Sequence, residues 1–274
     1  IEVDEVDTAM LNLKFPPAPR SGSYPVIMED VAKRYGDHLI FEHATLTINR
    51  GDKVAFVGKN GEGKSTLVKC IMGEIDFEGK LQLGHNVKIG YFAQNQAQLL
   101  DDKLTVFDTI DYVAQGDIRT KIRDILGAFM FGGEASDKKV EVLSGGERSR
   151  LAMIRLLLEP VNLLILDEPT NHLDTDSVQW LEAFLRQYRG TIFVISHDRY
   201  FLDQLTNRTF ELFNKSIRVY NGNYSYYVSQ REIQAELDEK AYEENLAERK
   251  RQQEVIDQLK AFGREKQVKR ARSR

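Results

Sequence analysis

The chain has 274 residues, enough to bury a full hydrophobic core, and its length alone allows one or two domains. The net charge of -4 excludes a uniformly polybasic nucleic-acid binder, and a single cysteine, Cys70, excludes a framework of intramolecular disulfides. The sequence contains no apolar run of transmembrane length and no visible signal peptide, so we expect a cytoplasmic protein without a membrane span.

Residues 1–24 begin acidic and then become rich in proline, which is typical of an extended linker. They start with Ile1 rather than Met, which we expect of a fragment or an engineered chain. The next β-like stretches are residues 26–28, 39–41 and 46–48. The apolar run Val54–Val57 then predicts a short strand buried in a parallel sheet.

The glycine-rich stretch after this strand matches the phosphate-binding pattern G-x-x-x-x-G-K-[ST] and continues into a helix-like segment. Glycines let backbone N–H groups converge on a phosphate chain, and the helix N-terminus adds its positive end. Lys64 is expected to reach the β- and γ-phosphates, and the Ser65 hydroxyl to bind Mg²⁺. An ordinary glycine turn is the alternative, which the flanking strand and helix disfavour. The predicted nucleotide-binding residues of this loop are Gly58, Lys59, Asn60, Gly61, Glu62, Gly63, Lys64, Ser65 and Thr66.

Strands and helices alternate beyond the glycine-rich stretch, which indicates an α/β fold with a largely parallel sheet. Residues 104–142 are predicted to be mostly helical, with a break at Gly132-Gly133, and another helix follows Gly146. The other expected elements are strands at 87–92, 163–166 and 192–195, and an amphipathic helix around Trp180 between the last two strands.

Two acidic residues, Asp167 and Glu168, directly follow the apolar strand 163–166. Burying carboxylates is costly unless they meet a metal or a water molecule. Asp167 suits Mg²⁺, directly or through water, and Glu168 is placed to polarise an attacking water. The alternative is that both residues only cap the turn at Pro169. His197 follows the next strand and is expected near the γ-phosphate, because ligands of open α/β sheets bind at the carboxyl ends of the strands.

Three further features are weak signals on their own. Gln94 can offer an amide oxygen to Mg²⁺, although glutamines are common in loops. Tyr35 can stack on an adenine, although an aromatic residue beside a glycine turn more often packs locally. The segment Leu143–Glu147 offers glycine N–H groups to an anion, but its serine can equally be a plain helix N-cap. Its predicted nucleotide-binding residues are Ser144, Gly145, Gly146 and Glu147.

The order of these motifs resembles that of the ATP-binding cassette family over residues 25–228. The matching segments are the glycine-rich loop, Gln94, Leu143–Glu147, Leu164–Pro169, Asn171–Asp174 and Ser196–Asp198. The resemblance implies a P-loop NTPase fold of the ATP-binding cassette type, with a helical subdomain and catalytic roles for Glu168 and His197. It also implies that ATP is bound between two cassettes, each lending its loop 144–147 to the other's nucleotide, with Asp174 at the shared interface. The expected ligands of Mg²⁺ are Ser65, Gln94 and Asp167.

Finer features resemble the ABC-F branch, namely Glu168–Asp174, Ser196–Asp203 and Tyr220–Ser225. Its members are soluble, membrane-free ATPases with two cassettes joined by a charged helical linker, and many act at the ribosome near tRNA. Residues 229–274 resemble the start of such a linker, a long charged helix that ends in a basic stretch. Such a stretch suits phosphate backbones, so ribosomal RNA or tRNA are the expected partners, against the alternative of a solvated helix face. Its charged residues are Lys260, Arg264, Lys266, Lys269, Arg270, Arg272 and Arg274, against Glu265.

The chain departs from the ABC-F pattern because it has one cassette. The part before Asp174 looks more like a second cassette, and the part after it more like a first cassette that runs into its linker. A fragment, a recombined gene or an engineered unit would each show this order. The partner cassette is therefore expected from another copy or from sequence outside the chain.

The leading hypothesis is an ABC-F-type ATPase that closes on ATP with a second cassette and acts on translation. A nucleotide-binding subunit of an ABC membrane transporter is the alternative, which the long charged helix disfavours. A DNA-repair or chromosome-type ATPase would carry long coiled coils before Leu143, where the gap here is short. A module that only clamps ATP is disfavoured because Lys64, Asp167, Glu168 and His197 are all present.

Overall fold

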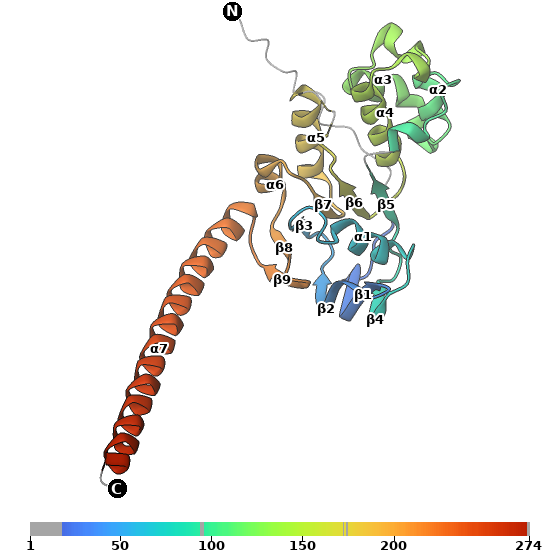
Figure 1. The fold of residues 1–274 in the computed structure, drawn as a ribbon. Coiled ribbons are helices and arrows are strands. Elements are labelled where there is room, and N and C mark those ends of the chain that lie inside the picture. The colour runs from blue at the N-terminus through green and yellow to red at the C-terminus, as the bar shows by residue number, and fades with distance from the viewer. Residues whose placement is uncertain (1–17, 94–95, 172, 174, 273–274) are drawn as a thin grey trace, which may run out of the picture. The chain divides into compact units, whose positions relative to one another are not determined.

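The computed structural model describes residues 18–272 except 94–95, 172 and 174, and the chain divides into two compact units, residues 1–225 and 226–274 (Figure 1). The strands of the first unit are β1 (Val26–Tyr35), β2 (His38–Ile48), β3 (Lys53–Val57), β4 (Glu78–Leu83), β5 (Ile89–Phe92), β6 (Leu163–Asp167), β7 (Thr191–Ile195), β8 (Arg208–Phe213) and β9 (Ser216–Tyr220). Its α-helices are α1 (Lys64–Met72), α2 (Val106–Asp111), α3 (Ile122–Ala128), α4 (Gly145–Leu157), α5 (Thr175–Gln187) and α6 (Arg199–Leu205).

The larger sheet has six strands in the order β5-β6-β7-β3-β8-β9, and every neighbouring pair is parallel except β8–β9. The predicted largely parallel sheet is therefore confirmed. Its central strands β3, β6 and β7 are short apolar runs, as expected for strands covered on both faces. Because they run in one direction, the residues that follow them, Gly58, Glu168 and Ser196, lie at the same edge of the sheet.

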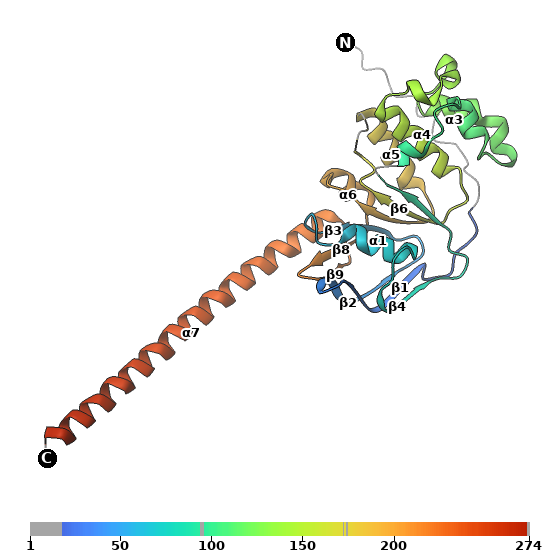
Figure 2. The ribbon, with the colours of Figure 1, turned by 45° about the vertical axis from the view of Figure 1, so that its right-hand side comes forward.

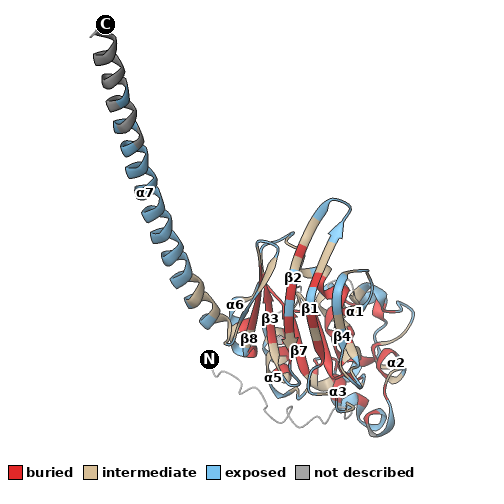
Figure 3. Cartoon of the chain, turned by 90° about the horizontal axis from the view of Figure 1, so that it is seen from below, coloured by how far each residue is buried: buried red, intermediate tan, exposed pale blue. Residues whose placement is uncertain are grey.

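A second sheet of three antiparallel strands, in the order β2-β1-β4, lies on the side of α1 that faces away from the larger sheet (Figures 1 and 2). Its inward-facing residues, such as Phe41, join one core with Leu67 of α1 and Phe56 of the larger sheet. Figure 3 shows buried residues in β1 and β2 among half-buried and exposed ones, whereas β4 is mostly exposed. The three short β-like stretches expected before Gly51 are parts of the two long strands β1 and β2, and β4 was not predicted.

The helical region, residues 106–157 with α2, α3 and α4, is inserted between β5 and β6 (Figures 1 and 2). The prediction that residues 104–142 are mostly helical is only partly right, because α2 and α3 are short and the rest is turns and 3₁₀ helices. Within the described residues, 3₁₀ helices lie at Gln96–Leu99, Gly116–Lys121, Gly133–Asp137 and Val140–Val142. Phe129, just after α3, packs on Trp180 of α5 with ring centroids 3.9 Å apart.

The helix α7 (Tyr224–Arg272) has 49 residues and supplies all the described structure of the second unit. Its residues from Glu232 to Val255 are exposed, and Figure 3 shows this length in pale blue. Its predicted charged, helical character is confirmed, although the helix begins before the expected Gln230. Among the described residues, none of the helices combines the length and hydrophobicity needed to span a bilayer.

Candidate nucleotide-binding site

The glycine-rich loop joins the end of β3 to the start of α1, which is the strand–loop–helix arrangement that its pattern predicts. Gly63 forms the N-cap of α1 with φ 110°, and no side chain caps this end of the helix. A Cβ atom on Gly63 would lie 2.2 Å from Cγ2 of Ile40, so the close approach of β2 also requires glycine here. The first N–H groups of α1 are thus available to an anion.

Lys64 lies folded onto the loop in which it occurs. Its Nζ donates hydrogen bonds to the carbonyl oxygens of Gly58 at 2.7 Å and Lys59 at 3.1 Å. Burial lowers the pKa of Lys64, and the negative charges of Glu168, Glu62 and Asp167 oppose this shift. The ammonium group therefore stands beside the loop carbonyls and within the field of the carboxylates that follow β6.

Ser65 and Asp167 meet across the gap between α1 and β6, with Ser65 Oγ 3.4 Å from Asp167 Oδ2. Burial raises the pKa of Asp167, while Ser65, Lys64 and Tyr91 oppose the shift. A hydroxyl and a carboxylate are hard oxygen donors that fit Mg²⁺, which usually completes its shell with phosphate oxygens and water. No group of three or more His, Cys, Asp or Glu side chains in the described residues could hold a metal by itself, so the nucleotide would have to supply ligands.

Glu168 and His197 form the second pair at this edge of the sheet. The Glu168 carboxylate accepts a hydrogen bond from the His197 backbone N–H at 3.2 Å, and its other oxygen lies 3.3 Å from His197 Nε2. Burial raises the pKa of Glu168, and the contacts with His197 oppose the shift. The backbone of Glu168 has φ 52°, and its N–H donates to the Ile195 carbonyl at 2.8 Å. A non-glycine residue in this region is strained, which is common at functional sites.

The segment 144–147 begins α4, and the ordinary N-cap weighed from its sequence is present. The Ser144 hydroxyl accepts a hydrogen bond from the Glu147 N–H at 3.3 Å, and the Glu147 carboxylate accepts one from the Ser144 N–H at 2.7 Å. These two bonds form a capping box. The hydrogen bond to the backbone of Ser144 is the main reason why the pKa of Glu147 is lowered. A second role as an anion contact stays a prediction.

The structure therefore brings together Lys64, Ser65, Asp167, Glu168 and His197, and no hydrogen bond among the described residues connects loop 144–147 to them. Tyr35 is half exposed at the end of β1. Lys33 Nζ lies over its ring, 4.8 Å from the ring centroid, in a cation–π contact. Its predicted contact with adenine stays a prediction. Gln94 and Asp174 lie outside the described residues.

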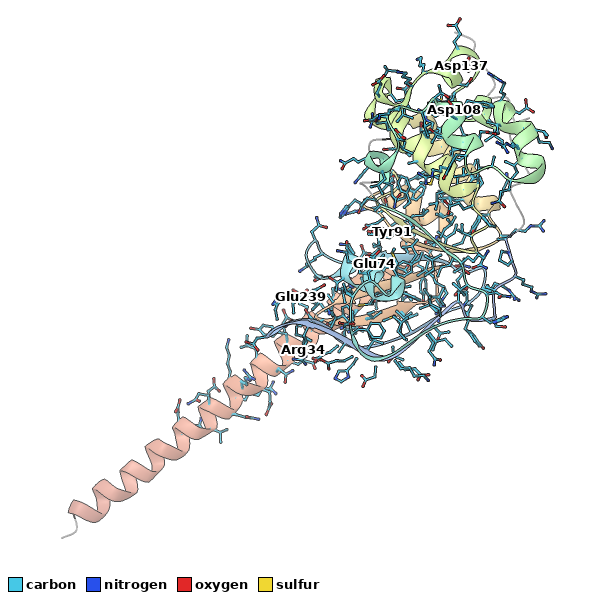
Figure 4. All side chains as sticks on the ribbon, turned by 90° about the vertical axis from the view of Figure 1, so that its right-hand side faces the viewer. Arg34, Glu74, Tyr91, Asp108, Asp137 and Glu239 are labelled. Atoms are coloured by element: carbon cyan, nitrogen blue, oxygen red, sulfur yellow. The ribbon has the colours of Figure 1, made fainter. Side chains whose placement is uncertain are left out.

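The sequence reasoning missed Tyr91 of β5, which interacts with the carboxylate of Asp167. Burial, followed by the negative charges of Asp167 and Glu74, raises the pKa of Tyr91 to about 12. Figure 4 labels Tyr91 and Glu74 in this part of the first unit. The parallel pairing of β5 with β6 places Tyr91 opposite Ile165, two residues before Asp167. The order of the strands in the sheet was the missing signal, because Tyr91 looks like an ordinary apolar strand residue without it.

Family profiles and curated relatives match this chain, and the matches cover most of its length. Two family profiles, both described as ABC transporter, match residues 41–171 and 210–274. The chain is 42% identical over 241 residues to "ABC transporter F family member 5" of Arabidopsis thaliana, covering 84% of this chain and 35% of the relative. It is 41% identical over 204 residues to "ATP-binding protein Uup" of Haemophilus influenzae, covering 73% of this chain and 31% of the relative. The chain thus spans about a third of the length of these curated relatives.

Solved structures share the fold at lower sequence identity. A bacterial Atm1-family ABC exporter with ATP bound superposes with a TM-score of 0.65 at 22% identity, covering 78% of this chain and 41% of the exporter chain. An ATP-binding cassette solved as a dimer with ADP and Pi superposes with a TM-score of 0.59 at 22% identity, covering 72% of this chain and 98% of that one. These likenesses establish the cassette fold of the first unit.

Proposed function

Because this chain belongs to the ATP-binding cassette family, with F-family members among its relatives, we propose that it hydrolyses ATP and closes on it with a second cassette. The observation that carries the proposal is the convergence of two pairs, Ser65 with Asp167 and Glu168 with His197, at the edge of the sheet where the glycine-rich loop begins. In this proposal the cassette comprises residues 25–228, between a linker end at 1–24 and the start of a linker at 229–274.

Binding would begin at the glycine-rich loop. Backbone N–H groups of the loop and of the α1 N-terminus would hold the phosphate chain, and Lys64 would turn from the loop carbonyls to the β- and γ-phosphates. Ser65 and Asp167 would hold Mg²⁺, which, when bound, neutralises charge on the phosphate oxygens. Tyr35 would stack on the adenine.

Hydrolysis would use the Glu168–His197 pair. Glu168 would accept a proton from a water molecule as the water oxygen attacks the γ-phosphorus and the bond to ADP breaks. A carboxyl group whose pKa is raised by burial is a better proton acceptor than an exposed one. His197, held against Glu168 through its backbone N–H and its ring, would orient the carboxylate and contact the γ-phosphate.

The second cassette would be another copy of the chain or sequence outside it. Each cassette would offer its loop 144–147, where α4 begins, to the nucleotide of the other. We place this activity in the cytoplasm and on the ribosome, where the basic end of α7 would contact ribosomal RNA or tRNA. The support for this step is the sequence of that end, in which residues 260–274 contain seven basic residues and one acidic residue. A transporter subunit has less support, because such a helix has no evident role there.

The experiment that tests the proposal is co-sedimentation of the full chain with ribosomes, using Glu168→Gln with ATP and Mg²⁺ at low and moderate salt. This variant keeps the phosphate-binding glycine-rich loop but loses the proton acceptor. It should therefore hold ATP with the two cassettes closed. We expect pelleting with ribosomes that requires ATP and weakens with salt.

Lys64→Ala is the matched control, because it should lose ATP binding while keeping α7 unchanged. Pelleting of Lys64→Ala to the same extent would contradict ATP-gated binding. Absence of pelleting in a Glu168→Gln protein that binds ATP would contradict the ribosomal role of this chain and leave the ATPase to be tested by phosphate release.

A further inference from the structure

Asp102 touches both ends of the segment that contains loop 144–147. Its backbone carbonyl accepts a hydrogen bond from the Glu141 N–H at 3.3 Å, before the loop. Its carboxylate accepts a hydrogen bond from the Arg148 guanidinium, directly after the loop. One residue from outside the helix thus brackets the whole segment Val142–Glu147.

The entry to this segment is fixed by a short antiparallel ladder. The Val106 N–H donates to the Lys138 carbonyl at 2.9 Å, and the Val140 N–H donates to the Leu104 carbonyl at 2.9 Å. An isolated bridge pairs Thr105 with Lys139 between these bonds. Residues 102–106 therefore hold residues 138–141 along their length, and Asp102 is the last rung before the loop begins.

The exit of the segment is fixed through Arg148 in the first turn of α4. Its backbone N–H donates to the Ser144 carbonyl at 2.9 Å, so its position depends on the capping box at the same helix end. The side chain of Arg148 is 22% exposed, whereas that of Asp102 is 58% exposed. An ion pair so open to solvent contributes little to global stability, so its main effect is on local geometry.

We propose that Asp102 and Arg148 are positioning residues that hold loop 144–147 in the shape that receives the phosphates of a nucleotide. The inference rests on the proposed function, in which this loop contacts the nucleotide of the partner cassette. N–H groups bind an anion well only when their directions are fixed beforehand. The hydrogen bonds of Asp102 to Glu141 and Arg148 fix the loop at both of its ends. Neither residue would touch the nucleotide itself.

The test compares Asp102→Asn, Arg148→Gln and the charge swap Asp102→Arg with Arg148→Asp. Arg119→Gln is the matched control, because it breaks another ion pair of the helical region, with Asp111 at 2.6 Å, that does not touch the loop. Asp108 and Asp137 mark this region in Figure 4. Amide hydrogen exchange at residues 143–148, the KM for ATP in hydrolysis, and the affinity for ADP with Mg²⁺ are measured for each full-length variant.

We expect faster exchange at 143–148 in both single variants and a KM for ATP raised about three- to ten-fold, the range that corresponds to a loss of up to about 1.4 kcal/mol. Affinity for ADP should stay unchanged, because ADP is bound by the glycine-rich loop of one cassette and not by loop 144–147 of its partner. The charge swap should restore the KM for ATP. Arg119→Gln should resemble the unmodified protein in every measurement.

Exchange at 143–148 that is the same in Asp102→Asn, Arg148→Gln and Arg119→Gln would overturn the inference. Parallel loss of ADP affinity and ATP turnover would also overturn it, because the effect would then be general rather than local to the loop. If the unmodified protein hydrolyses no ATP, the proposed function fails, and the exchange measurement alone decides whether Asp102 and Arg148 hold the loop.

Discussion

At the scale of single residues, Gly63 shows how closely the phosphate cradle is packed. Gly63→Ala should lower the free energy of unfolding by about 2–4 kcal/mol, because alanine is strained at φ 110° and its Cβ would overlap Ile40. Nucleotide affinity should fall with it, since the backbone must shift to relieve the overlap. Urea unfolding and calorimetric titration with ADP measure the two effects.

Gly61→Ala is the matched control for this prediction. Gly61 has φ 82° but open space around its Cβ position, so alanine there should cost only the backbone strain of about 1–2 kcal/mol. Equal losses in the two variants would show that contact with Ile40 has no energetic consequence.

At the same scale, Asp167 illustrates the cost of burying a carboxylate. Burial raises its pKa, so the folded state binds the proton more tightly than the unfolded chain does. The contribution of Asp167 to stability should therefore fall as pH rises from the unfolded pKa near 4 through the higher folded pKa, because ionisation is the unfavourable step. Asp167→Asn should remove this slope and raise the free energy of unfolding without nucleotide by about 0.5–2 kcal/mol.

The measurement is urea unfolding of both proteins between pH 4 and pH 7, without nucleotide. Asp111 provides a contrast, because its pKa is lowered by the hydrogen bond to Arg119 and its contribution should run in the opposite direction. Lower stability of Asp167→Asn at neutral pH would contradict the view that this carboxylate is held at a cost for function.

At the scale of elements, the capping box decides where α4 begins. Ser144→Ala should lower the free energy of unfolding by about 0.5–2 kcal/mol, because it leaves the Glu147 N–H without its acceptor. Ser144→Asp should restore most of the loss, since aspartate is an equally good N-cap. Thermal unfolding followed by circular dichroism gives the comparison, and equal midpoints for all three proteins would contradict it.

Glu147 adds a pH dependence to this helix start. Its pKa is lowered in the folded state, so the stabilisation it provides is present above the unfolded pKa of about 4.3 and is lost as pH falls through the folded pKa. Glu147→Gln should remove this acid-sensitive part while keeping an oxygen that can accept the bond from the Ser144 N–H. Unfolding curves at pH 3–6 would then be flatter for Glu147→Gln than for the unmodified chain.

The elements differ in how far the sequence predicted them. The strands β3, β6 and β7 were predicted because each is an unbroken apolar run between a turn and a motif. The strand β4 has mostly exposed polar residues, so neither hydrophobic period marks it. In β8 the buried Glu211 interrupts the apolar run, and its carboxylate accepts a hydrogen bond from the Tyr220 hydroxyl of β9 at 3.1 Å, a contact that the sequence does not reveal.

At the scale of the whole molecule, the first unit should be stable without most of α7. Residues Glu232 to Val255 are exposed, so this stretch of α7 contributes little buried apolar surface, and its role is tested by removing the chain after residue 235. The shortened protein should unfold within about 3 °C of the full chain and bind ADP equally well, with a smaller helical signal in circular dichroism. A much lower unfolding midpoint would contradict this view.

The candidate site was predictable as a set of residues and less so as an arrangement. Each of Lys64, Asp167, Glu168 and His197 follows a predicted strand. Because parallel strands end at the same edge of a sheet, the sequence alone predicted that these residues lie at one edge. The contact of Ser65 with Asp167 and the strained backbone of Glu168 needed coordinates, since both depend on the relative height of neighbouring strands. The anion role of loop 144–147 cannot follow from one copy of the chain, because its predicted ligand belongs to a partner.

The packing of Trp180 against Phe129 gives this protein an optical property. Trp180 is the single tryptophan of the chain. It lies on α5, which follows β6, and its ring centroid is 3.9 Å from that of Phe129 in the helical region. The same ring stacks on Phe184 of α5 with centroids 5.5 Å apart, so its emission spectrum reports on the contact between the helical region and α5. Any ligand that shifts one against the other would change the colour or brightness of that single fluorophore, so such movement can be followed in real time without attaching a dye.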